Sequence, residues 1–186
     1  MRKNIKSGIK RVWNNDTFWG RLTSISTLVV AITIVPLSCQ LEVSKNVATS
    51  DFIVKMHGEF NSPRMLKIRK DVAKLDFKKS ENLSGCEDIL DFFDKIAYLE
   101  KTGVMNLDAV SQTWGYWIER YWLLCKDHVH NFRSKEIDSS YYKSVENLSE
   151  RLMLRKSKET GISVNEYTKK IENDLENFKQ EESELI

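Results

Sequence analysis

Three residues have side chains suited to metal chemistry. Cys125 and His128 lie three positions apart, a spacing that places both on one face of a helix, and Cys86 could join them. Thiolate and imidazole are good zinc ligands, but a closed zinc site needs four ligands and a fourth is not in evidence. A buried cysteine that packs as a small apolar side chain is therefore favoured, and we predict no metal and no cofactor. Three cysteines without paired spacing also do not indicate a disulfide framework.

A pair of acidic residues is the next candidate for chemistry. Glu119 and Asp127 are eight positions apart, about 12 Å along a helix axis. Helical periodicity places both on the outward face, where a solvated charged surface is the simpler explanation. Nucleotide-binding loops, zinc fingers and protease motifs are absent from the sequence. We therefore expect a protein that is not an enzyme and has no small-molecule substrate.

Residues 114–122 include five aromatic side chains, the most distinctive stretch of the sequence. On a helix with 100° per residue, three of them fall on one stripe that we expect to face the core: Trp114, Trp117 and Tyr121. Stacking of a planar ligand against them is a less favoured alternative. Tyr116 and Trp122 lie off this stripe. If both are exposed beside Arg120, they form a patch suited to binding another protein.

The composition favours helices as the elements that position these residues. The 186-residue chain is 30% charged and has only seven glycines and two prolines, fewer turn residues than a β protein needs. We predict one all-α bundle of about five helices. Periodic apolar residues place helices near residues 63–77, 86–101, 107–132 and 140–155. Ser62 and Pro63 mark the first of these starts, and Gly103 and Gly161 are the expected stops.

A last helix is expected after Gly161, where Ser163 and Glu166 form a capping-box pattern. Its apolar stripe is thin. It suits a seam against a partner helix, or docking on the chain's own domain, which we favour. Together with the aromatic patch it defines a candidate interaction surface, formed by Tyr116, Arg120, Trp122, Tyr167, Ile171, Leu175 and Phe178.

The segment Leu22–Leu41 has no charged residue over 20 positions, the length needed to cross a hydrocarbon core of about 30 Å. Residues 1–21 before it carry a net charge of +5, which leaves −3 for the rest of the chain. We predict a single-pass helix in the cytoplasmic (inner) membrane with the N-terminus inside, because basic flanks stay in the cytoplasm. A cleaved signal ending near Ser38-Cys39 is an alternative. Since the basic charge is local, no nucleic-acid partner is expected.

Three stretches of sequence resemble one protein family. They are Asn61-Ser-Pro-Arg-Met, the Phe-Phe-x-x-Ile-Ala-x-Leu-x-x-x-Gly pattern ending at Gly103, and Trp114-Gly-Tyr-Trp-Ile-Glu-Arg-Tyr-Trp122. Over residues 22–155 the chain resembles the bacterial, archaeal and phage family catalogued as domain of unknown function 4760. The resemblance implies an all-helical, membrane-attached protein and supplies no catalytic residues. Members have basic residues after the membrane helix, unlike this chain, which argues against the orientation predicted from charge.

Four segments are therefore predicted: a basic tail at 1–21, a transmembrane helix at 22–41, a helical domain at 42–160, and an amphipathic helix with an acidic tail at 161–186. The expected function is that of a membrane-anchored helical interaction or tethering protein. Its expected partners are the membrane and either a protein or a second copy of the chain. The alternative is a membrane effector of a phage-defence or prophage-exclusion system, in which the polar-rich membrane helix self-associates.

Overall fold

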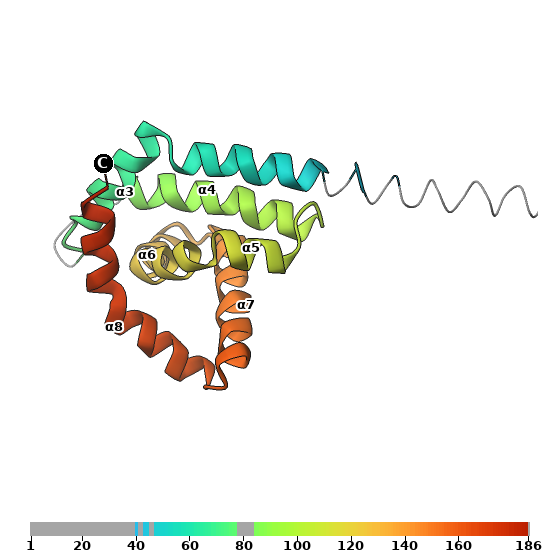
Figure 1. Ribbon diagram of the computed structural model, residues 1–186. Helices are drawn as coiled ribbons and strands as arrows, with labels where there is room; N and C mark the ends of the chain where they lie inside the picture. Colours follow the sequence, from blue (N-terminus) through green and yellow to red (C-terminus); the bar gives the residue numbers. More distant parts are fainter. Residues whose placement is uncertain (1–39, 41–42, 45–46, 78–83, 186) are drawn as a thin grey trace, which may run out of the picture. The chain divides into compact units, whose positions relative to one another are not determined.

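The computed structural model describes residues 40, 43–44, 47–77 and 84–185, and within them the regular elements are helices (Figure 1). Residues 47–60 are helical. The labelled helices follow as α3 (Pro63–Ala73), α4 (Ser84–Lys101), α5 (Leu107–Thr113), α6 (Gly115–Glu136), α7 (Lys143–Thr160) and α8 (Val164–Ser183). The chain divides into two compact units, Met1–Ala48 and Thr49–Ile186, and the second is described below. The prediction of an all-α bundle is confirmed for the described residues.

The predicted membrane span is not supported. Among the helices of the described residues, none combines the length and the apolar character that crossing a bilayer requires. Residues 22–39 and 41 of the predicted span lie outside the described residues. The fold class is therefore corrected to an all-helical bundle in which no described helix spans a membrane. The single-pass inner-membrane localisation depended on that span and is corrected with it.

Local capping signals set the helix ends, as the sequence predicts. The Ser62 hydroxyl accepts a hydrogen bond from the Met65 amide at 3.3 Å, which satisfies a free donor at the start of α3. Ser163 does the same for the Glu166 amide at the start of α8, at 3.2 Å. After α4, Gly103 has φ 72°, a left-handed conformation that glycine adopts without a Cβ clash.

One predicted helix, at residues 107–132, is two helices in the structure. The backbone leaves the helical region at Trp114, with φ −127° and ψ −5°, so α5 and α6 point in different directions (Figure 1). Val110, Trp114 and Ile118 are all fully buried and keep four-residue spacing across the break. Apolar periodicity alone therefore does not reveal where one helix ends and the next begins.

Aromatic side chains fill the centre of the bundle. The ring of Phe60 stacks on Phe92, with centroids 5.0 Å apart, and lies 5.8 Å from Phe93. The edge of Trp117 reaches the same ring at 5.4 Å, so the helix at 47–60, α4 and α6 meet at Phe60. Trp114 and Tyr121 are fully buried as predicted, whereas Trp117 is half-buried.

A disulfide joins α4 to α6. Cys86 and Cys125 are both fully buried, and their Cα atoms are 5.9 Å apart. This corrects the interpretation of Cys125 as a free cysteine that packs as a small apolar side chain. The two residues are 39 positions apart, so no local spacing signals the bond. With both sulfurs bonded to each other, neither can act as a thiolate ligand for a metal.

Candidate helix-docking site

The C-terminal helix α8 packs against α3, α6 and α7. Only three of its residues are buried, two apolar anchors and one carboxylate: Ile171, Phe178 and Glu182. Ion pairs follow its contact with α6, joining Lys126 to Glu172 at 3.0 Å and Arg120 to Asp174 at 2.9 Å. Glu182 is the unusual residue of the three, because charged side chains are rarely buried.

Four hydrogen bonds converge on the Glu182 carboxylate, which is 4% exposed. Arg69 donates two, from Nε to Oε2 and from Nη2 to Oε1, both at 2.7 Å. The Tyr121 hydroxyl donates to Oε2 at 2.6 Å, and the Trp117 indole N–H donates to Oε1 at 3.2 Å. We call Arg69, Trp117 and Tyr121 the carboxylate site. Its paired guanidinium donors match the geometry of a carboxylate, and two further donors satisfy the remaining lone pairs.

The surroundings keep these donors in their donating forms. Arg69 is 2% exposed, and its guanidinium lies 4.0 Å above the ring of Phe60. Burial lowers the pKa of Arg69, but the hydrogen bonds and charge of Glu182 outweigh it and leave the pKa raised. Burial, followed by the charge of Glu182, raises the pKa of Tyr121. The guanidinium is therefore always charged and the phenol always protonated when α8 is docked.

An aromatic slot beside the carboxylate site holds Phe178. Its ring meets the rings of Tyr121 and Tyr116 edge-on, with centroids 5.1 and 5.8 Å apart. The guanidinium of Arg120 lies over the ring of Tyr116, 3.7 Å from the ring centroid. The Tyr116 hydroxyl donates to Glu181 at 2.8 Å. One turn of α8 thus places an aromatic ring and a carboxylate into adjacent, chemically different sites.

The structure brings together five of the seven residues of the predicted interaction surface, at the contact between α6 and α8. Tyr116, Arg120 and Tyr167 are partly exposed there, whereas Ile171 and Phe178 are buried. Leu175, the sixth, is half-buried and packs against the core. These side chains dock α8 on its own domain, the favoured of the two roles considered for this helix. They are corrected from an open surface to an intramolecular contact.

Trp122 does not belong to that contact. It is only 5% exposed, and its ring meets His130 edge-on at 6.1 Å. The exposure of Trp122, on which the aromatic patch depended, is therefore not met. The reason is that α6 packs against α4, α5, α7 and α8, so residues off its aromatic stripe are also covered.

The helices packed around α6 also bury Glu119, which was expected to be solvated together with Asp127. Asp127 is exposed, but Glu119 is 2% exposed. The Tyr167 hydroxyl donates to its Oε2 at 3.0 Å, while Oε1 has no hydrogen-bond partner among the described residues. Burial raises the pKa of Glu119 from 4.5 to about 7, although Tyr167 and Arg120 act in the opposite direction. The two acids are therefore in different environments and do not form a pair.

The stability of the protein should depend on pH through Glu119. Its folded pKa is raised, so the stability is greatest below the unfolded pKa of 4.5 and is lost as the pH rises through about 7. The nearby groups are Arg120, Lys156 and Glu159, besides Tyr167. Urea unfolding from pH 4.5 upward should show a loss of at most about 3 kcal/mol that Glu119→Gln removes. Equal pH slopes for the two proteins would contradict this assignment.

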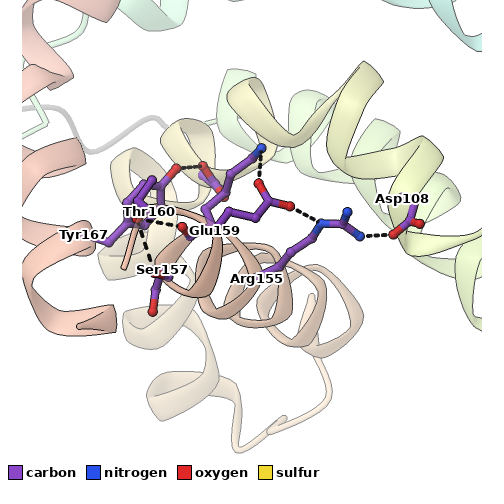
Figure 2. A network of polar contacts seen from close by, with 8 residues as sticks. Asp108, Arg155, Ser157, Glu159, Thr160 and Tyr167 are labelled. Carbon is purple, nitrogen blue, oxygen red and sulfur yellow. Dashed lines mark hydrogen bonds and ion pairs between the residues drawn. The ribbon is translucent and has the colours of Figure 1, made fainter. Parts of the chain in front are cut away.

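A polar network holds the end of α7 that leads into α8 (Figure 2). The side chain of Arg155 lies between Glu159 of its own helix, at 2.7 Å, and Asp108 of α5. The Thr160 hydroxyl donates to the carbonyl of Lys156 at 2.7 Å. The last turn of α7 is thereby fixed to α5, independently of α8.

A second polar cluster lies near the disulfide. Glu87 Oε1 accepts from the Tyr141 hydroxyl at 3.0 Å and lies 3.3 Å from His128 Nε2. Tyr142 donates to Asp91 at 2.6 Å. These contacts tie the α6–α7 turn to α4. In the described part of the chain, no group of three or more histidine, cysteine or acidic residues could hold a metal ion.

In the comparison with known proteins, the residues of the carboxylate site fall inside a family match, while Glu182, which occupies the site, falls outside it. A family model described as domain of unknown function (DUF4760) matches residues 21–152. No curated protein and no solved structure matches the chain. Arg69, Trp117 and Tyr121 lie inside the matched region, and Glu182 lies outside it with the whole of α8. The match covers well over half of the sequence, and the chain belongs to this family.

Proposed function

We propose that this member of the DUF4760 family is a protein-interaction domain that binds an acidic amphipathic helix at the carboxylate site. One observation carries the proposal: residues within the family match build a site for a carboxylate, and a helix outside the match fills it. α8 is then the built-in occupant of a site that other helices of the same kind can enter. An enzyme is not proposed, since the buried donors here serve recognition rather than a reaction.

The contacts of α8 define what the site would recognise. Ile171, Phe178 and Glu182 lie at positions i, i+7 and i+11, so they share one face of the helix. Helix-in-groove recognition uses anchors at such spacings. An aromatic residue four positions before an acidic residue would place a ring between Tyr116 and Tyr121 and a carboxylate on Arg69. The proposed ligand is therefore a helix with this pair and an apolar anchor two turns earlier.

The energetics allow α8 to leave this site. Only two apolar side chains of its twenty residues are buried. A buried ion pair adds little net stability, because the loss of hydration offsets the attraction between the charges. Elements that bury little apolar surface are the ones that open first in native proteins. A helix with stronger apolar anchors could then compete with α8 for the same donors.

A labelled peptide of residues 161–186 tests the proposal. In the full-length Phe178→Ala variant α8 loses an anchor, so its own helix competes less well for the site. We expect fluorescence anisotropy to show that the peptide binds this variant about tenfold more tightly than the wild type, in line with the loss of a buried aromatic anchor. A Glu182→Gln peptide should bind much more weakly, because it cannot pair with the Arg69 guanidinium.

A Glu176→Gln peptide is the matched control. Glu176 has the same side chain, but on α8 it is 86% exposed. This peptide should bind as tightly as the unmodified one. If both substituted peptides bind equally well, or if the folded Phe178→Ala protein binds no peptide, the carboxylate site is not a recognition site.

A further inference from the structure

We infer that the helix that enters the carboxylate site from outside is α8 of a second copy, so that two chains exchange their C-terminal helices. This inference rests on the proposed function, because it uses the same site. In the exchanged dimer each copy supplies its Glu182 to Arg69, Trp117 and Tyr121 of the other. The contacts are those already present within one chain. No new recognition chemistry is needed, and only the connection between α7 and α8 changes.

That connection is short and has the geometry of a hinge. Three residues, 161–163, separate α7 from α8, and Gly161 has φ 72°. Figure 1 shows α7 and α8 diverging from this turn, so the far half of α8 lies away from α7. It reaches α3 instead, where Lys70 donates to the carbonyl of Leu185 at 3.0 Å. Exchange therefore requires α8 to leave α3, α6 and α7 as well as the turn to open.

Side-chain contacts order the helix ends on either side of the hinge. On the α7 side, Arg155 is bound to Asp108 and Glu159 (Figure 2). On the α8 side, Ser163 caps the helix start through the Glu166 amide. The conformational change is therefore confined to residues 161–163. Hinges this short favour exchange between copies, because a short connection limits how the two helices can rearrange within one chain.

The second copy is the occupant that the chain itself supplies. Every copy carries both the site and a helix that fits it, with the aromatic ring and the carboxylate at the required spacing. The charges are complementary, since the site presents a buried guanidinium and α8 presents a carboxylate. Exchange keeps both groups paired, whereas any other occupant would displace Glu182 into water.

The substitution Gly161→Ala separates the closed monomer from the exchanged dimer. The closed turn needs a left-handed residue 161, which alanine adopts at a cost, whereas an open hinge lets residue 161 take a right-handed conformation. Each dimer relieves the strain at two hinges. We expect the dimer association constant, measured by light scattering during size-exclusion chromatography of the full chain, to rise about tenfold or more.

Gly103→Ala is the matched control. Gly103 also has φ 72°, and an added Cβ at either glycine would meet no atom within 4 Å. The two substitutions therefore introduce the same backbone strain, but Gly103 does not connect to an exchangeable helix. The Gly103→Ala protein should keep the wild-type association constant. In the Gly161→Ala background, Glu182→Gln and Glu176→Gln should both leave the association constant nearly unchanged, because exchange keeps one contact between Glu182 and Arg69 per copy in monomer and dimer alike.

Three results would overturn the inference. They are equal association of the two glycine variants, a Gly161→Ala dimer whose association constant falls sharply with Glu182→Gln, and a Gly161→Ala protein that stays monomeric while the peptide 161–186 still binds Phe178→Ala. The last result would leave the proposed function intact. If the Gly161→Ala protein does not fold, native mass spectrometry of mixed ¹⁵N-labelled and unlabelled wild-type chains decides. Mixed-mass dimers that persist in Glu182→Gln chains support exchange, and monomers alone at the highest soluble concentration exclude it.

Discussion

Arg69→Met is expected to lower the free energy of unfolding by about 3 kcal/mol and to release the far half of α8. Without the guanidinium, the buried Glu182 carboxylate keeps only Tyr121 and Trp117 as donors. A buried charge without its partner is strongly destabilising. Because Glu182 lies near the end of the chain, it can return to water when α8 undocks, and this limits the loss. Urea unfolding and hydrogen exchange of the α8 amides would measure the two effects.

Arg64→Met is the matched control for this change. Arg64 is on the same helix and pairs with Asp88 at 2.9 Å, but its side chain is 79% exposed. Exposed ion pairs contribute about 0 to 1 kcal/mol, so this variant should be close to wild type. The double variant Arg69→Met/Glu182→Leu should recover most of the lost stability, because it removes both buried charges together. Equal losses for Arg64→Met and Arg69→Met would contradict the role given to the buried pair.

Trp114→Ala is expected to lower the free energy of unfolding by about 3 to 5 kcal/mol, the cost of a large cavity in a packed core. Trp114 is fully buried at the break between α5 and α6. Trp117→Ala should lower stability less, because the Trp117 side chain is only half-buried. Its indole N–H donates a hydrogen bond to Glu182 of α8. Chemical unfolding of the two variants would measure the difference.

A second substitution at residue 114 tests the reason for this cost. The buried indole N–H of Trp114 has no hydrogen-bond partner among the described residues. Trp114→Phe keeps an aromatic ring in the core and removes that unpaired donor, so it should cost far less than Trp114→Ala. If Phe and Ala at residue 114 are equally destabilising, loss of packing is not the dominant effect.

Local signals in the sequence predict much of the fold. Ser62, Gly103 and Ser163 each act within one helical turn, and all three have the predicted capping or terminating role in the structure. The apolar stripe of the last helix also predicts correctly that it packs on the domain. In each case the residues that decide the structure are close together in sequence, so their spacing carries the information.

The parts that sequence analysis missed depend on pairs far apart in the chain. Arg69 and Glu182 are separated by 113 positions, and in the sequence Glu182 is simply part of an acidic tail. Glu119 was placed on an outward face because a single helix has one apolar stripe, while in the bundle other helices also cover that face. Periodicity describes one helix and cannot predict how many neighbours it has.

The disulfide between Cys86 and Cys125 encloses the turn at Gly103 and the junction at Trp114 in a closed covalent loop. A protease that cuts once between α4 and α5 would therefore not separate the two fragments. They would migrate as one species on a gel until a reducing agent is added. α8 lies outside this loop, so a cut at residues 161–163 would free it even in the oxidised protein. Limited proteolysis with and without reductant thus distinguishes the covalently closed core from the helix that only docks on it.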